Sequence, residues 1–246
     1  MSWDVDQFER FKTELAQPFR DLAELIEPRP NMRIVDLGCG TGELTRKLHE
    51  QFAATETVGI DSSDSMLQKA SPSATLHFQR GDIGSFTTDR PFDLVFSNAA
   101  LHWLPDHERL FKRLLSLLAP NGQLAVQMPA NHDHASHRIA AELASSFGIE
   151  PRTVNILSPE SYAALLHRLG FARQHVRLQV YGHVLASTRD VVEWTKGSTL
   201  TPYREALPAE RYGEFLAEYT DSLVATLGDS RPYFYTFKRV LFWATG

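Results

Sequence analysis

Hydrophobic positions near the start of the chain recur at steps of three and four residues, which is the spacing of an amphipathic helix. Between residues 8 and 27 these positions are Phe8, Phe11, Leu15, Phe19, Leu22, Leu25 and Ile26. The sequence EPRPN at 27–31 ends the pattern, because prolines interrupt a helix. We therefore predict an N-terminal helix over about residues 8–27.

From residue 32 onward, short apolar runs alternate with helix-spaced segments. The runs predict buried strands at 32–38, 56–61, 74–82, 92–98 and 122–129. Helical segments are predicted at 42–51, at 64–70 with a cap at Ser62, Ser63 or Asp64, and at 105–118 beginning with Pro105. Alternation of this kind is typical of βαβ units and of an α/β fold with a doubly wound, mostly parallel sheet.

The rhythm changes after Pro129. Helical patterns cover 130–148, 158–170, 188–207 and 208–228, and strand patterns cover 171–184 and 232–244. We expect the two late strands to extend the sheet within a single domain spanning residues 1–246. We also expect the N-terminal helix and a cap segment at about 183–230 to cover the active-site cleft.

Composition and charge limit the partners and the compartment. The formal charge is −5 without any Lys/Arg run, which argues against a nucleic-acid partner. A single cysteine, Cys39, allows no intramolecular disulfide and no Cys-based zinc site. No signal-peptide pattern is present, and no stretch approaches the roughly 18 apolar residues that span a bilayer. We expect a soluble cytoplasmic protein, monomeric or homodimeric, without a membrane partner.

A glycine-rich loop follows the first predicted strand. The segment IVDLGCGTGE, residues 34–43, contains Gly38, Gly40 and Gly42 behind the acid Asp36. In an open parallel sheet, ligands bind beyond the carboxyl ends of the strands, where glycines let the backbone approach closely. The dinucleotide fingerprint is G-x-G-x-x-G, whereas this loop reads G-x-G-x-G. An adjacent carboxylate favours a cationic ligand over a pyrophosphate.

The next strand ends carry further candidates. Asp61 is placed to accept hydrogen bonds from ribose hydroxyls, for a dinucleotide or for another nucleoside ligand. Asp82 could accept from an adenine amino group, with Ile83 and Met66 against the ring, although a turn acid is the alternative role of Asp82. The fourth strand ends in SNAALHWLPD, and there the residues expected to line the same crevice are Asn98, His102 and Trp103.

Taken in order, VDLGCGTGELT, VGIDSS with ML, GDI and FDLVFSNAALHWLPD resemble the successive motifs of class I S-adenosylmethionine-dependent methyltransferases. The resemblance implies a Rossmann-like, seven-stranded sheet whose last strand is antiparallel. It also implies that S-adenosylmethionine binds across the ends of strands one to four. The cofactor-binding residues so implied are Asp36, Gly38, Cys39, Gly40, Asp61, Ser62, Met66, Asp82, Ile83, Asn98 and Leu101.

A narrower resemblance runs over nearly the whole chain. The segments 100–133 and 191–207, together with the aromatic C-terminal strand, are similar to trans-aconitate 2-methyltransferases. Those enzymes methylate a carboxylate of a small tricarboxylic acid. Their first helix tends to carry arginines ahead of its proline, where this chain has Leu15 and Gln17, with Arg20 one turn further on.

A carboxylate acceptor is already ionised at pH 7, so its methylation requires no strong general base. His102 could donate a hydrogen bond to such an acceptor or act as a base for a hydroxyl, and a solvent-facing histidine is the alternative. His102 and Trp103 are therefore the catalytic candidates. The substrate-binding candidates are Arg20, Lys196, Tyr203 and Arg204, and for Tyr203 a packing role is the alternative.

Three histidines and Asp133 lie close together in NHDHASH, residues 131–137, a spacing that could be read as a metal site. We expect a solvated loop instead, and no metal. From the resemblance we expect carboxyl O-methylation of a small di- or tricarboxylic acid of the trans-aconitate type by in-line displacement. Three alternatives remain open: a carrier-bound acyl acceptor, a hydroxyl or amine of another metabolite, and a cofactor-binding module without turnover.

Overall fold

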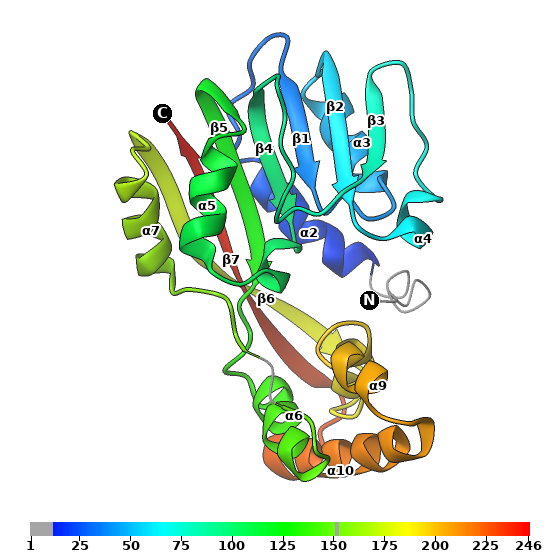
Figure 1. Cartoon of the computed structure of the whole chain (residues 1–246). Helices are drawn as coiled ribbons and strands as arrows, with labels where there is room; N and C mark the ends of the chain where they lie inside the picture. The colour runs from blue at the N-terminus through cyan, green and yellow to red at the C-terminus, as the bar shows by residue number, and fades with distance from the viewer. Residues whose placement is uncertain (1–11, 151–152) are drawn as a thin grey trace. The chain divides into compact units, whose positions relative to one another are not determined.

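The N-terminal helix is present in the computed structural model, which describes residues 12–150 and 153–246 (Figure 1). Helix α2 (Lys12–Ala23) buries Phe19 and Leu22, two residues of the predicted apolar stripe. Phe8 and Phe11, which also belong to that prediction, lie outside the described residues. The helix ends at Ala23, four residues before the predicted end, and residues 24–26 form a turn.

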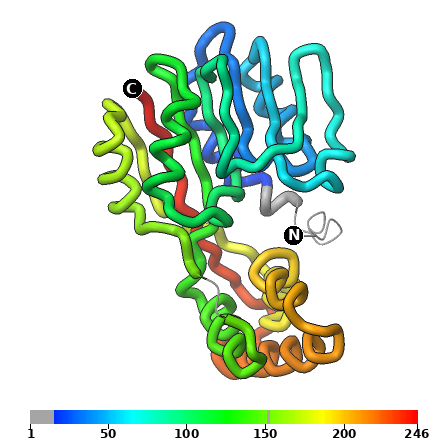
Figure 2. The backbone as a smooth tube through the Cα atoms, viewed as in Figure 1, coloured from blue at the N-terminus to red at the C-terminus, as the bar shows by residue number. Residues whose placement is uncertain are grey.

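Seven strands form one sheet in the order β3-β2-β1-β4-β5-β7-β6. Their bounds are β1 (Arg33–Leu37), β2 (Glu56–Asp61), β3 (Leu76–Arg80), β4 (Phe92–Asn98), β5 (Leu118–Pro129), β6 (Arg173–Leu185) and β7 (Tyr233–Thr245). The five strands β1 to β5 run parallel to one another, and β7 runs antiparallel to β5. The predicted fold class is therefore confirmed, including the antiparallel last strand. The arrows of β1, β2, β4 and β5 lie side by side in Figure 1, and Figure 2 traces the backbone that connects them.

Helices cover both faces of this sheet. On one face, α2 and α3 (Glu43–Gln51) pack against the strands, and Phe19 meets Phe96 edge-on with ring centroids 5.5 Å apart. On the other face, α5 (His107–Leu115) and α7 (Pro159–Arg168) contribute aromatic rings to a cluster with Phe242 of β7. Short helices α4 (Asp64–Leu67) and η1 (Leu101–Trp103) follow β2 and β4.

From residue 15 on, the chain divides into two compact units. The larger contains residues 15–129, 155–179 and 239–246, and the smaller contains 130–150, 153–154 and 180–238. Strands β6 and β7 contribute residues to both. Whether the segment at 183–230 covers a cleft stays a prediction. Among the described residues, no helix combines the length and apolarity that crossing a membrane requires.

The smaller unit has its own core. Helices α6 (Ala135–Ser146), α8 (Asp190–Lys196), α9 (Thr201–Ala206) and α10 (Ala209–Leu227) enclose it, and α6 packs against α10. Aromatic side chains of Trp194, Phe215, Tyr219 and Tyr235 are buried there. This unit thus includes α6, which the sequence pattern did not assign to the cap.

Several boundaries differ from the sequence prediction, and for two of them the structure shows the cause. Strand β5 begins at Leu118 rather than 122, because Leu118 already pairs with Phe92 before the register shifts. The residues between the two paired stretches form an irregularity within β5, in which Asn121 has a φ of 58°. Helix α6 begins at Ala135 rather than 130, because the ring of His134 accepts from the Ser136 N–H and caps the helix there.

Candidate cofactor site at the carboxyl ends of the parallel strands

The glycine loop after β1 is bonded to the end of β2. The N–H groups of Gly38 and Cys39 both donate to the carbonyl of Ile60, at 2.8 and 3.0 Å. Gly38 has a φ of 85°, and a Cβ placed on it would lie 2.1 Å from the Cβ of Ala100. Only glycine therefore lets this loop approach the segment after β4 so closely. Around Gly40, by contrast, no atom lies within 4 Å of an added Cβ, so its backbone borders open space.

Asp36 is buried at the end of β1, with 3% of its surface exposed. Thr45 of α3 donates to its carboxylate over 2.6 Å. Burial raises the pKa of Asp36 to about 7, and the nearby charge of Asp61 adds to the shift. A cationic ligand beside it would favour its ionised form. Burial also raises the pKa of Cys39 and keeps its thiol protonated, which fits a small packing side chain.

Asp61 ends β2 and faces the glycine loop. One carboxylate oxygen accepts from the Gly40 N–H at 2.8 Å, and the other accepts from the Ser63 N–H at 2.9 Å. Ser63 in turn caps α4, in which Met66 is buried. Ser62 is exposed between them. The structure therefore brings the Asp61 carboxylate and the loop backbone together, as the sequence pattern predicts.

The segment after β3 contains Asp82 and Ile83. The exposed Asp82 carboxylate accepts from the Gly84 N–H at 2.8 Å, so the alternative role as a turn acid is present in the structure. Ile83 borders the glycine loop, with its Cδ1 3.6 Å from a Cβ built on Gly38. Arg113 of α5 donates to the carbonyls of Ile83 and Phe86 and holds this segment in place.

The turn after β4 contains the remaining core candidates. Asn98 Oδ1 accepts from the amide of Gln127 at 2.8 Å, with that amide oriented to satisfy its neighbours. Leu101 is fully buried, backbone and side chain alike. His102 and Trp103 are half-buried, with ring centroids 4.7 Å apart. These residues share the carboxyl edge of the parallel strands with the glycine loop and Asp61.

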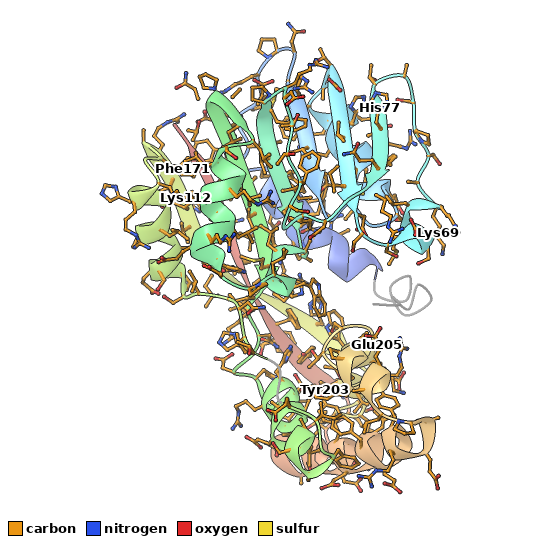
Figure 3. The ribbon with its side chains drawn as sticks, in the orientation of Figure 1. Lys69, His77, Lys112, Phe171, Tyr203 and Glu205 are labelled. Carbon is orange, nitrogen blue, oxygen red and sulfur yellow. The ribbon has the colours of Figure 1, made fainter. Side chains whose placement is uncertain are left out.

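The substrate-side candidates have different surroundings. Arg20 is exposed on α2, and its guanidinium donates to the neutral amide oxygen of Gln17 at 2.6 Å. Lys196 forms an ion pair with Glu193 at 2.6 Å. Tyr203, labelled in Figure 3, is buried and stacks on Phe215 with centroids 5.0 Å apart, so it packs in the core of the smaller unit. Arg204 is half-buried, with its charge near Tyr212.

The expectation of a solvated loop at residues 131–137 is wrong for two of the histidines. His134 and His137 are half-buried, and both rings are within hydrogen-bond distance of the Ser136 hydroxyl. His137 Nε2 lies 3.0 Å from the Thr199 hydroxyl, and burial lowers the pKa of His137 to about 4. Within residues 12–150 and 153–246, no three His, Cys, Asp or Glu side chains are arranged to hold a metal ion.

Several supporting residues escaped the sequence analysis. His107 and Tyr162 form a buried contact between α5 and α7, and Arg113 and Gln127 bond to backbone or side chains at the site. Their partners lie far away in sequence, so no local pattern marks them. The role of Thr45 as a partner of Asp36 could have been predicted. Thr45 lies on the first turn of the helix that follows the glycine loop, and one residue of that turn faces the preceding strand.

Comparison with known proteins agrees with this geometry. A family model described as "Methyltransferase domain" matches residues 8–176. The YcgJ protein of Bacillus subtilis has the same fold, with a TM-score of 0.62 and 16% identity, covering 93% of this chain and 97% of that one. A protein from Mesorhizobium loti, described as an S-adenosylmethionine-dependent methyltransferase, has a TM-score of 0.55 and 23% identity, covering 94% and 98%.

Fold, motifs and family match together define a class I S-adenosylmethionine-dependent methyltransferase. A trans-aconitate 2-methyltransferase of Deinococcus radiodurans is 44% identical, with 100% of this chain and 98% of the relative covered. One of Rhizobium meliloti is 39% identical, with 91% and 90% covered. The chain belongs to the family of these proteins.

Proposed function

We propose that this enzyme transfers a methyl group from S-adenosylmethionine to a carboxylate of a small tricarboxylic acid of the trans-aconitate type. The observation that carries the proposal is the 44% identity, over the whole chain, to a relative named for that reaction. The smaller unit also retains the segment 191–207 on which the narrower resemblance rests, folded as α8 and α9.

The proposed cofactor site fits its ligand in charge and in the number of hydrogen-bond acceptors that it offers. S-Adenosylmethionine, when bound, supplies an electrophilic methyl group on a positively charged sulfur that leaves as a neutral thioether. Asp36 offers a buried acid for a cationic ligand. The two Asp61 oxygens provide roughly four lone-pair sites, of which backbone N–H groups use two, so ribose hydroxyls can occupy the rest. The open backbone at Gly40 allows close approach.

On the acceptor side, the protein has to orient an anion rather than remove a proton. The acceptor carboxylate is ionised at pH 7, so its oxygen is the nucleophile without a general base. We propose that His102 donates a hydrogen bond to the acceptor and that Trp103 excludes water beside it. Among the described residues, the hydrogen-bond partner of Arg20 is the neutral amide of Gln17, whereas Lys196 would have to exchange Glu193 for the substrate.

The experiment that tests this function is an acceptor screen with the purified enzyme and S-adenosylmethionine. The panel contains trans-aconitate, other di- and tricarboxylic acids, a carrier-bound diacid, phenols and amines. We expect methyl esters of tricarboxylic acids as the main products by mass spectrometry. Methylation of phenols, amines or the carrier-bound acid alone would overturn the proposal.

Substitutions then locate the cations that hold the acid. Arg20→Gln and Arg204→Gln should raise the KM for the acid by about tenfold, the cost of one lost charge-assisted hydrogen bond, with an unchanged Kd for S-adenosylhomocysteine. Arg211→Gln is the matched control, because Arg211 pairs with Glu214 on the exposed side of α10. Equal effects of all three substitutions would exclude a specific role for Arg20 and Arg204.

A further inference from the structure

A buried histidine at the start of α5 is bonded to the turn that contains His102 and Trp103. His107 has only 2% of its surface exposed, and its Nε2 lies 3.2 Å from the carbonyl oxygen of Leu101. A carbonyl oxygen can only accept, so Nε2 must carry the hydrogen. The Leu101 carbonyl therefore receives a directed hydrogen bond from α5.

The other ring nitrogen fixes this tautomer. Nδ1 of His107 lies 2.6 Å from the hydroxyl of Tyr162, a fully buried residue of α7. The Tyr162 oxygen already accepts from the Leu157 N–H at 3.2 Å, so its own hydrogen is available for Nδ1. Burial lowers the pKa of His107 and raises that of Tyr162, which keeps the histidine neutral and the phenol protonated. In this arrangement Nε2 donates and Nδ1 accepts, and the backbone of Leu104 is a further hydrogen-bond partner of the ring.

The anchored carbonyl belongs to the peptide that leads into His102. Leu101 is held by its buried side chain on one side and by His107 on the other. The next carbonyl, that of His102, accepts from the Asn155 amide at 3.4 Å. Both peptide planes of η1 are thus bonded to residues outside the turn, which leaves the following side chains little freedom.

We propose that His107 is a positioning residue for methyl transfer: its neutral Nε2–H, oriented by Tyr162, fixes the turn that presents His102 and Trp103. The inference rests on the proposed function, in which those two side chains meet the acceptor. Because the bond acts on η1 and not on Asp61, its loss lowers kcat and raises the KM of the acceptor by more than it raises the Kd of the cofactor product.

Two isosteric replacements separate positioning from packing. In His107→Gln the amide nitrogen reaches the place of Nε2 and still donates to Leu101, whereas in His107→Asn the amide ends at the place of Nδ1. We expect His107→Gln to keep kcat within about threefold of wild type, and His107→Asn and Tyr162→Phe to lose about tenfold or more. Exposed His167→Gln, on α7, is the control.

The measurements are kcat and KM for the acid, the Kd of S-adenosylhomocysteine by calorimetry, and the thermal midpoint of each variant. Activity losses that follow the thermal midpoints, with His107→Gln and His107→Asn alike, would overturn the positioning role. A rise in Kd equal to the fall in kcat would also overturn it.

A spectroscopic readout keeps the inference separate from the proposed function. Long-range proton–nitrogen NMR of the histidines at pH 7 should show His107 as the neutral Nε2–H tautomer, with a shift that changes in Tyr162→Phe. An Nδ1–H tautomer or an imidazolium would contradict the inference whatever the acceptor is. A correct tautomer together with no methylation of any acid would instead overturn the proposed function alone.

Discussion

The carboxylate of Asp61 accepts a hydrogen bond from the backbone N–H of Gly40 at 2.8 Å, which joins the end of β2 to the glycine loop of β1. Its second oxygen accepts from Ser63 at the start of α4. The carboxylate of Asp61 therefore connects the glycine loop to the start of α4 through both of its oxygens.

Replacement of this acid should weaken cofactor binding in two steps. Asp61→Asn keeps an acceptor but loses the charge, so we expect the Kd of S-adenosylhomocysteine to rise about tenfold. Asp61→Ala loses both the acceptor and the charge, and we expect a rise of about a hundredfold. Isothermal titration measures both values. Asp64→Asn, which removes only an exposed ion pair with Arg80, is the control and should leave the Kd unchanged. A normal Kd in Asp61→Ala would rule out the proposed site.

The buried acid Asp36 should make stability depend on pH in an unusual direction. In the folded protein Asp36 keeps its proton up to about pH 7, whereas in the unfolded chain it ionises near 3.8. Between these values ionisation favours the unfolded chain, so the free energy of unfolding falls as pH rises, by at most about 1.4 kcal/mol per unit, and levels off above pH 7.

Urea unfolding of the wild type and Asp36→Asn at about pH 5, 6, 7 and 8 measures this slope. The Asn variant cannot ionise, so the difference between the two proteins should shrink toward low pH and stay constant above pH 7. Parallel profiles over the whole range would show that Asp36 is ionised in the folded state at every pH tested.

The fold could be predicted from the sequence because its signals are local. Alternating apolar runs and helix spacing identified β1 to β5, and the position of Asp61 at a strand end followed from the same pattern. The site's supports could not be predicted in this way. His107 and Tyr162 are separated by 54 intervening residues, and only the packing of α5 against α7 brings their rings together.

The errors in the predicted boundaries of helices and strands have the same cause, because contacts between distant residues decide them. The pattern LLSLL at 114–118 suits a helix or a buried strand equally well, and only the pairing of Leu118 with Phe92 decides between them. Histidines in a polar segment suggest a solvated loop, yet the Nε2 of His137 lies within hydrogen-bond distance of the Thr199 hydroxyl, a contact between residues far apart in sequence. Sequence analysis likewise identified Tyr203 as a substrate candidate, whereas its stacking on Phe215 indicates a packing role.

Arg113 should support the cofactor site through the backbone. It donates to the carbonyls of Ile83 and Phe86, and each bond contributes about 0.5–1.5 kcal/mol to holding the segment after β3. We expect Arg113→Ala to raise the Kd of S-adenosylhomocysteine by about tenfold, with Arg113→Lys intermediate, as measured by calorimetry. The neighbouring Lys112→Ala, an exposed position on α5 labelled in Figure 3, is the control. Equal effects at both positions would contradict this role.

Gly38 should tolerate no side chain while Ala100 is present. The added Cβ of Gly38→Ala would stand 2.1 Å from the Cβ of Ala100, so the loop or η1 must shift and both stability and cofactor affinity should fall. Ala100→Gly in the same chain removes that contact and should restore part of the loss, leaving the strain of a positive φ.

Gly213 provides the opposite case for the same substitution. It lies exposed in α10 with no atom within 4 Å of an added Cβ, so Gly213→Ala should stabilise the protein by about 0.5–1 kcal/mol. Thermal unfolding of the Gly38 and Gly213 variants compares the two. Failure of Ala100→Gly to rescue Gly38→Ala would show that backbone strain alone explains the loss.

The most direct test of carboxylate methylation follows the label itself. Purified enzyme is incubated with trans-aconitate and S-adenosylmethionine labelled in the methyl group, and the product is treated with mild alkali. A methyl ester releases its label as volatile methanol, whereas a methyl ether or methylamine keeps it. We predict transfer of label to the acid and its quantitative release by alkali. Label that stays bound after alkali, or no transfer to the acid while other acceptors are labelled, would contradict the account.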